Sequence, residues 1–231
     1  MAMLNILSAG AAQVVVQYTM DVFRRDTGAE VAADFGAVGA MKAKALGGAP
    51  VDVIVLTQPM IDELIASGFV LPGRADLGKV GTGVAVRAGV TKPDVASADS
   101  LRAVLRAASV ITCPDPAIAT AGKIVMTSLE KLGITAEVQD RLKFFPNGNG
   151  AMNWLADNGD VHAIGITQNT EILPVAGVKY VGPLPDEFQA KATYSAGCVA
   201  NSTHDAEAKD FISRLTSPAA KPMLVAAGYE F

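Results

Sequence analysis

Residues 4–57 read LNILSAGAAQVVVQYTMDVFRRDTGAEVAADFGAVGAMKAKALGGAPVDVIVLT, and this stretch decides the fold. Runs with strand character lie at Leu4–Ser8, Glu30–Phe35 and Val51–Leu56, and two longer runs with apolar residues at helical spacing separate them. Each helical run ends at glycine, which commonly stops a helix. A chain that alternates strand and helix in this way is expected to form a parallel sheet covered by helices.

The same alternation continues beyond residue 57, with turns rich in glycine and proline between the elements. Ser100 is the expected N-cap of the next long helix. The later strands are expected at Val80–Arg87, Val110–Cys113, Leu142–Phe145, Ala163–Thr167, Val178–Val181 and Thr193–Val199, and the later helices at Asp62–Ser67, Leu101–Leu105, Ala119–Leu132, Asn149–Asp157, His204–Leu215 and Pro218–Ala227.

The chain is expected to cross twice between two groups of elements. Glycines near the start of the Val80–Arg87 strand mark the first crossing, and Gly182–Pro185 precede the long return strand of the second. A chain of 231 residues is long enough for two lobes of about 100 residues each. We therefore expect one lobe from residues 1–82 and 194–231 and another from residues 83–193, with a ligand cleft between them.

The composition excludes several classes of protein. Half of the residues are hydrophobic and 18% are charged, which predicts a compact fold rather than a disordered chain. No apolar run reaches the ~18 residues that a membrane span needs. The net charge of −4 argues against nucleic acid as a partner, because the only basic doublet, Arg24-Arg25, stands at a predicted helix end.

The two cysteines, Cys113 and Cys198, are too few for a zinc site, and their spacing suggests none. Each ends an apolar strand-like run, which favours a free, buried thiol, while a disulfide between the two remains open. We expect neither a metal nor a cofactor.

Four turns built from small residues stand directly before predicted helices. Small side chains let a ligand approach the backbone, and a helix start offers N–H donors and about half a positive charge. Such turns hold a small anion without side-chain cations. None of the four matches the lysine-containing phosphate loop or the glycine pattern of dinucleotide sites. The turns are Ser8–Ala12, Gly36–Gly39, Ala117–Gly122 and Asn147–Gly150.

Several of these turns belong to longer segments that point to one family. The segments are LNILSA at 4–9, FGAVGA at 35–40, GAPVDV at 48–53, DPA at 115–117 with AGK at 121–123, GITQ at 165–168 and VGPLP at 181–185. With them, nearly the whole chain resembles the molybdate-binding solute receptors and their relatives.

The resemblance implies the α/β fold of type 2 periplasmic binding proteins, with two lobes, each a mostly parallel sheet flanked by helices, and two crossover strands. It implies a monomeric receptor of an ABC-type transport system, which closes on a small anion and delivers it to a membrane permease. The location is periplasmic if an export signal has been removed. Because Met1–Leu4 show no such signal, it is cytoplasmic if Met1 is the native start.

Three positions depart from the usual pattern of molybdate receptors. Those receptors offer hydroxyl side chains where this chain has Gly10-Ala11 and Ala37-Val38, and commonly a tyrosine where Gln168 stands. Each lost hydrogen bond to a charged acceptor removes about 1.5–3 kcal/mol. We therefore predict an organic carboxylate rather than molybdate. Apolar side chains would pack against it, and polar side chains would form hydrogen bonds with it. The predicted ligand-binding residues are Ser8, Gly10, Ala11, Ala37, Val38, Thr57, Ile118, Ala119, Thr120, Lys123, Asn149 and Gln168.

An isomerase of a small unsaturated tricarboxylate is the alternative, because aconitate isomerases also resemble this family and need a proton-abstracting residue. The lack of a signal peptide favours this alternative. Asp115 is the best-placed acid or base, although an Asp-Pro pair also initiates turns. His162 has no acid nearby in sequence and is assigned a structural role. Since no paired acid and base is evident, we predict a receptor without catalytic residues.

Overall fold

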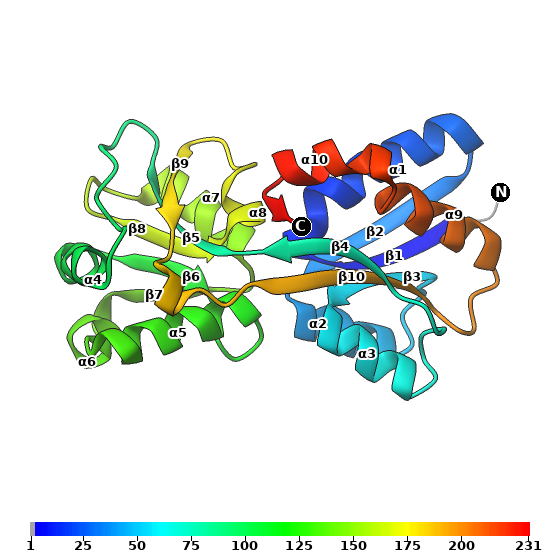
Figure 1. The fold of residues 1–231 in the computed structure, drawn as a ribbon, viewed down its shortest axis with the longest axis horizontal. Helices are drawn as coiled ribbons and strands as arrows, with labels where there is room; N and C mark the ends of the chain where they lie inside the picture. The colour runs from blue at the N-terminus through cyan, green and yellow to red at the C-terminus, as the bar shows by residue number, and fades with distance from the viewer. Residues whose placement is uncertain (1–2) are drawn as a thin grey trace. The chain divides into compact units, whose positions relative to one another are not determined.

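The computed structural model describes residues 3–231, which divide into two compact units (Figure 1). Unit 1 comprises the chain up to Val80 and from Ala192 onward, and unit 2 comprises Gly81–Lys191. The chain therefore leaves unit 1 after one strand and returns to it at the start of another. Within the described residues, none of the helices combines the length and apolar character that a membrane crossing requires.

The sheet of unit 1 has six strands in the order β11-β4-β10-β3-β1-β2. β1 pairs in parallel with both β2 and β3, while β10 pairs antiparallel with β3 and β4. The strands are β1 Met3–Ala9, β2 Glu30–Gly36, β3 Val53–Thr57, β4 Ala75–Val80, β10 Ala192–Cys198 and β11 Tyr229–Glu230.

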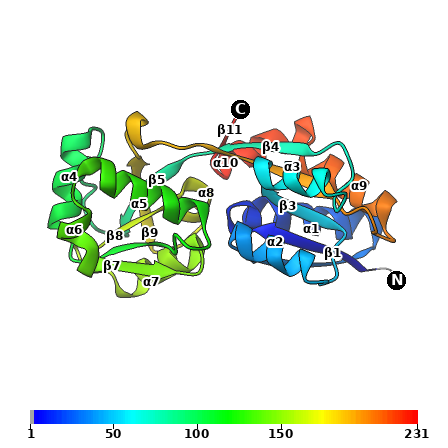
Figure 2. The ribbon, with the colours of Figure 1, turned by 90° about the horizontal axis from the view of Figure 1, so that it is seen from below.

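Helices cover both faces of this sheet. α1 and α9 pack together on one face, and α2 and α3 lie on the other, which faces the viewer in Figure 2. Every residue of β3 is buried because the strand is covered on both sides, and this explains its uninterrupted apolar run. The helical elements are η1 Gly10–Ala12, α1 Gln13–Thr27, α2 Val38–Leu46, α3 Gln58–Ala66, α9 Asp205–Leu215, η4 Pro218–Ala220 and α10 Lys221–Ala226.

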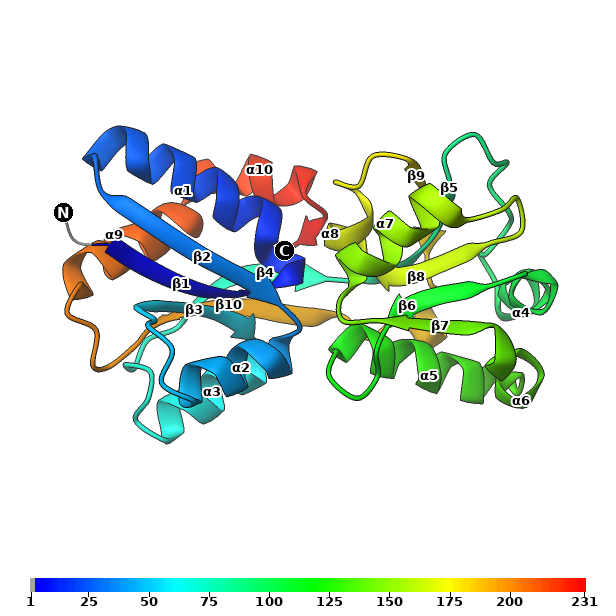
Figure 3. The same cartoon turned by 180° about the vertical axis from the view of Figure 1, so that it is seen from behind.

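The sheet of unit 2 has five strands in the order β7-β6-β8-β5-β9, with α7 and α5 on opposite faces (Figure 3). β6 pairs in parallel with β7 and β8. The strands are β5 Thr82–Arg87, β6 Ile111–Pro114, β7 Leu142–Phe145, β8 Ile164–Gln168 and β9 Val178–Pro183. The helical elements are α4 Ala98–Ala107, α5 Thr120–Leu132, α6 Thr135–Val138, η2 Gln139–Arg141, α7 Gly148–Asn158, α8 Asn169–Ile172 and η3 Asp186–Phe188.

The two-lobed α/β fold predicted from the sequence is confirmed, but both sheets are mixed rather than mostly parallel. In unit 1 the outgoing β4 and the returning β10 lie side by side and antiparallel. In unit 2 the incoming β5 runs antiparallel to both β8 and β9. A chain that enters and leaves each unit once through neighbouring strands must place those strands in opposite directions.

Two local predictions were wrong in detail. The strand predicted at Val80–Arg87 is β5 alone, and β4 precedes it, with Gly81 standing between the two strands. The N-cap of α4 is Ser97, whose side chain accepts a hydrogen bond from the amide of Ser100 in a capping box. Ser100 is thus the third residue of the helix and supplies the reciprocal bond to the amide of Ser97.

Gln189 ties together the two segments of unit 2 that lead to unit 1. Its side-chain amide donates to the carbonyls of Thr82 (2.6 Å) and Leu184 (3.1 Å), and its oxygen accepts from the amide of Thr82 (3.1 Å). Thr82 follows the first crossing and Gln189 precedes the second. One side chain therefore fixes the spacing of the incoming and outgoing chain.

Both cysteine thiols are free and buried. Burial raises the pKa of Cys113 to about 12, and the nearby negative charge of Asp115 adds to this effect. Burial also raises the pKa of Cys198. Both thiols are therefore poor nucleophiles at neutral pH.

Asp52, just before β3, is buried and gathers four hydrogen bonds. It accepts from the amide (2.7 Å) and side chain (3.3 Å) of Asn5, from the hydroxyl of Ser202 (2.6 Å) and from Nδ1 of His204 (3.2 Å). Burial alone would raise the pKa of Asp52, but the hydrogen bonds from Ser202, Asn5 and His204 hold it below its ordinary value. The network joins β1, β3 and the chain after β10.

We expect Asp52→Asn to destabilise the protein by about 2 kcal/mol at pH 7, because hydrogen bonds to a charged acceptor are lost. A lowered pKa means that this stability is present above the unfolded carboxyl's pKa of ~3.9 and is lost as the pH falls through the lower folded value. The gap between wild type and variant should therefore close below about pH 4. Urea unfolding at several pH values measures it.

The matched control is Asp62→Asn, because Asp62 forms an exposed ion pair with Arg74 (2.8 Å). Such pairs contribute at most about 1 kcal/mol. A gap for Asp52→Asn that stays constant from pH 7 to pH 3 would contradict the assigned role of the charge.

Candidate ligand-binding site

The C-terminal ends of β1, β2 and β3 form one edge of the unit 1 sheet. The parallel registers place Ala9 beside Gly36 and Ser8 beside Val55, so the turns that follow these strands lie at the same edge. We call this the unit 1 edge. It holds half of the predicted ligand-binding residues, namely Ser8, Gly10, Ala11, Ala37, Val38 and Thr57, all of which are buried.

Internal contacts hold the turn after β1 in place. The Ser8 hydroxyl donates to the carbonyl of Ala9 (3.1 Å), so its proton is directed at the backbone. The Tyr229 hydroxyl donates to the carbonyl of Ala11 (3.2 Å) and joins the C-terminal β11 to this turn. Sequence reasoning missed Tyr229, because its partner lies 218 residues earlier in the chain.

The C-terminal ends of β6, β7 and β8 form the corresponding unit 2 edge. The registers place Pro114 beside Phe145 and Thr112 beside Gly165. The other predicted residues follow these strands. Ala119 and Gln168 are buried, Thr120 and Asn149 are half-buried, and Ile118 and Lys123 are exposed.

Three helices of nine residues or more begin directly after residues of these edges without a side-chain cap: α2, α3 and α5. Within residues 3–231, α2 after Ala37, α3 after Thr57 and α5 after Ala119 have no side-chain hydrogen bond at the N-cap, and a proline in the first turn of α3 removes one of its free amides. By contrast, Ser97 caps α4 and Asn147 caps α7. Alanine at a helix start leaves N–H groups and the positive end of the helix dipole for another acceptor. The uncapped starts are the best-suited anion donors of the two edges.

Asp115 is a turn-forming residue in this structure. Its carboxylate accepts from the amide of Ala117 (2.8 Å), and its carbonyl accepts from Ile118 and Ala119 (3.2 and 2.9 Å). These bonds shape the turn that leads into α5. At Gly122 a Cβ would lie 2.3 Å from the carbonyl oxygen of Pro114, so only glycine lets α5 pack this closely against the turn.

The turn before α7 differs from the predicted anion turn, because two of its amides already have acceptors in unit 2. The amide of Gly150 donates to Asn147 Oδ1 (2.8 Å), and that of Gly148 donates to Glu171 Oε1 (3.2 Å). Glu171 also accepts from the Thr167 hydroxyl (2.7 Å) and is 5% exposed. Sequence reasoning missed Glu171; an acidic residue in the otherwise uncharged run of 163–178 was the available signal.

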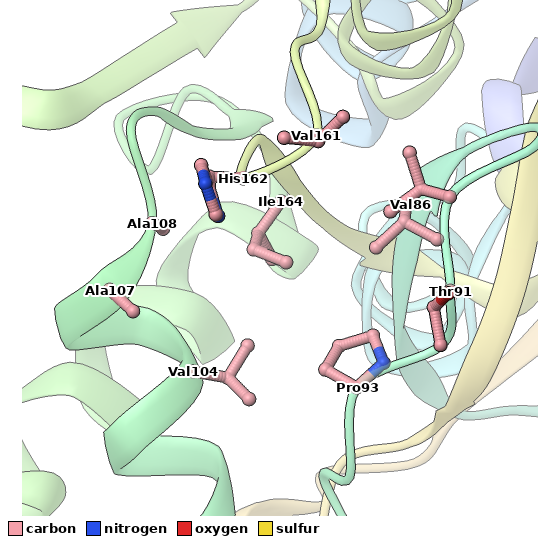
Figure 4. A pocket seen from close by; sticks show the side chains of 10 residues that line it. Val86, Thr91, Pro93, Val104, Ala107, Ala108, Val161, His162 and Ile164 are labelled. Carbon is pink, nitrogen blue, oxygen red and sulfur yellow. The ribbon is translucent and has the colours of Figure 1, made fainter.

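His162 lies away from the unit 2 edge. It precedes β8, whose far end carries Gln168 about 20 Å away at ~3.3 Å per residue. It lines a mostly apolar hollow of about 140 Å³, shown in Figure 4, with Val86, Val90, Thr91, Pro93, Val104, Ala107, Ala108, Val161 and Ile164. A base acting at the unit 2 edge cannot come from this position.

A sequence profile of the family described as bacterial extracellular solute-binding proteins matches residues 4–230. The chain belongs to this family. Among individual solute-binding relatives, the molybdate-binding protein ModA of Haemophilus influenzae is 24% identical over 227 residues, which cover 96% of this chain and 87% of ModA. An aconitate isomerase of Pseudomonas sp is 24% identical over 222 residues, which cover 93% of this chain and 82% of the isomerase.

The fold agrees with that of solved members. The periplasmic molybdate-binding protein of Azotobacter vinelandii superposes with a TM-score of 0.82 and 24% identity, over 99% of each chain. The solute-binding protein described here therefore has the two-lobed α/β fold that its resemblance to molybdate receptors predicted, with mixed rather than mostly parallel sheets.

We expect Ala37→Ser and Ala119→Ser each to stabilise the ligand-free protein by about 1 kcal/mol, because a serine hydroxyl would accept from the second or third amide of the helix. Both alanines already have the extended backbone conformation of an N-cap residue. Urea unfolding of the free protein measures the effect. Ser97→Ala is the reverse control and should cost a similar amount, since it removes an existing cap. Unchanged stability in both serine variants would mean that these helix starts already have other acceptors.

Proposed function

We propose that the protein is a receptor that acts outside the cytoplasm. It binds one small organic di- or tricarboxylate and delivers it to an ABC-type permease in the membrane. Membership of the extracellular solute-binding family supports the receptor role. The observation that carries the proposal is the pair of uncapped helix starts, α2 and α5, one on each edge.

The uncapped helices suit the carboxylates of such a ligand. A helix start binds an anion through backbone N–H groups and its dipole, with no cationic side chain. This matches a chain whose net charge is −4 and in which Lys123, the one cation among the predicted ligand-binding residues, is exposed.

The side chains near these helix starts are suited to contact the hydrocarbon part of an organic acid. Ala11, Ala37 and Val38 place buried apolar groups at the unit 1 edge, where a fully oxygenated ion would need hydrogen bonds. Thr57 and Gln168 are the buried polar side chains among the predicted residues besides Ser8. An oxyanion loses about 1.5–3 kcal/mol for each charged hydrogen bond that it cannot make. An organic acid gains from the same methyl groups by apolar burial.

An isomerase is the second candidate, because a relative of 24% identity is an aconitate isomerase. Moving a double bond within a tricarboxylate needs a group that removes a proton from carbon. The carboxylate of Asp115, the residue first considered for this role, already accepts a hydrogen bond within its own turn. We therefore favour a receptor that leaves its ligand chemically unchanged.

A thermal-shift and calorimetric screen tests the ligand class. The probes are molybdate, tungstate and sulfate on one side, and citrate, tricarballylate, cis-aconitate and trans-aconitate on the other. We expect a tricarboxylate to stabilise the protein by about 2.7 kcal/mol at a 100-fold excess over its dissociation constant, and molybdate to have a much smaller effect. Stabilisation by molybdate alone would contradict the organic ligand.

Proton NMR of cis- and trans-aconitate incubated with the protein in D2O then separates receptor from isomerase. A receptor leaves both spectra unchanged. Interconversion or exchange of carbon-bound protons for deuterium, if lost in Asp115→Asn, would establish the isomerase instead.

A further inference from the structure

The Glu171 carboxyl lies at the junction of two segments that reach the unit 2 edge. It belongs to α8, directly after β8 and Gln168, and α8 packs against α7 (Figure 3). One oxygen accepts from the amide of Gly148, the first residue of α7, and the other accepts from the hydroxyl of Thr167. One side chain therefore joins the start of α7, next to Asn149, to the β8–α8 corner that carries Gln168.

The Glu171 carboxyl packs closely against the backbone of Gly148. A Cβ built on Gly148 would lie 2.1 Å from Glu171 Oε2 and 2.2 Å from Thr167 Oγ1. Glycine at the first position of α7 thus makes space for the carboxyl, and the carboxyl occupies the place that a side chain would take. A shift of Glu171 would move the start of α7 with it.

Glu171 is buried, with 5% of its surface exposed, yet it has no cationic partner among residues 3–231. The charged or titratable side chains on the elements packed against α8 are Asp157 on α7, Arg87 on β5, and Lys179 and Tyr180 on β9, and none of them pairs with it. Burial raises the pKa of Glu171, while the bonds from Thr167 and Gly148 oppose this shift. A second negative charge arriving at the same edge would favour the protonated form still further.

We propose that Glu171 is a positioning residue for an anion site at the unit 2 edge and takes up a proton from solvent when the anion binds. The inference rests on the proposed function. The neutral carboxylic acid can still accept from Gly148 through its carbonyl oxygen, and its own proton can be donated to the Thr167 oxygen. The geometry is kept while the repulsion between two carboxylates is removed.

The burial of the Glu171 carboxyl predicts how ligand affinity should depend on pH. If the bound state holds one more proton than the free state, affinity rises as the pH falls and approaches a tenfold loss for each unit of pH increase in the steepest range. Glu171→Gln mimics the protonated acid in shape and hydrogen bonding. It should bind at least as tightly as wild type at high pH, and its affinity should vary less with pH.

The test is calorimetric titration of wild type and Glu171→Gln with trans-aconitate and with molybdate between pH 5 and pH 8. Each titration is run in two buffers of different ionisation enthalpy, which counts the protons taken up. The same probe is used for both proteins, so protons bound or released by the probe itself cancel. We expect wild type to take up more protons than the variant. Glu171→Ala should weaken binding about tenfold or more at every pH, because the carboxyl's place is left empty.

Thr167→Val separates positioning from general stability. It removes the hydroxyl that favours the charged carboxyl. The variant should therefore shift the pH range of proton uptake upward, which a structural defect alone would not do. Equal proton uptake and equal pH dependence in wild type and Glu171→Gln would overturn the inference while leaving the receptor intact. If neither probe nor any other anion of the screen binds wild type, the proposed function fails, and this inference fails with it.

Discussion

The position of β1 between β2 and β3, parallel to both, is the constraint on which the unit 1 edge depends. Because the three strands end at the same side of the sheet, the turns after Ala9, Gly36 and Thr57 meet there whatever their side chains are. Burial of β3 on both faces holds the sheet in this register, since a slip by one residue would turn every side chain to the opposite face. Unit 2 repeats the arrangement with β6 between β7 and β8.

The helices that start at these edges are of two kinds. α7 satisfies its first amides within unit 2, through Asn147 and the carboxyl of Glu171. α2, α3 and α5 lack side-chain caps among the described residues, and α2 and α5 follow an alanine. A folded protein leaves few amides without acceptors, so the proposed receptor function would account for these uncapped helix starts through a bound anion that supplies the missing acceptor.

Sequence periodicity predicted the order of strands and helices well, because burial on one or both faces leaves a local pattern. It could not predict the mixed sheets, since the direction of β10 beside β3 and β4 depends on partners more than a hundred residues away. The contact of Asp52 with His204 spans 152 residues and has no local signal. Ser100 was read as an N-cap because serine suits both the cap and the third position of a capping box. The predicted ligand contacts themselves remain predictions.

The buried apolar side chains at the unit 1 edge have an electrostatic consequence. Alanine and valine exclude water from the start of α2, and a drier surrounding lowers the effective dielectric constant around the remaining backbone dipoles. Each N–H group then interacts more strongly with a carboxylate placed in line with it and discriminates more sharply against a poorly placed oxygen. Selectivity would thus arise from the direction of a few backbone donors and the apolar shape between them rather than from the number of polar side chains.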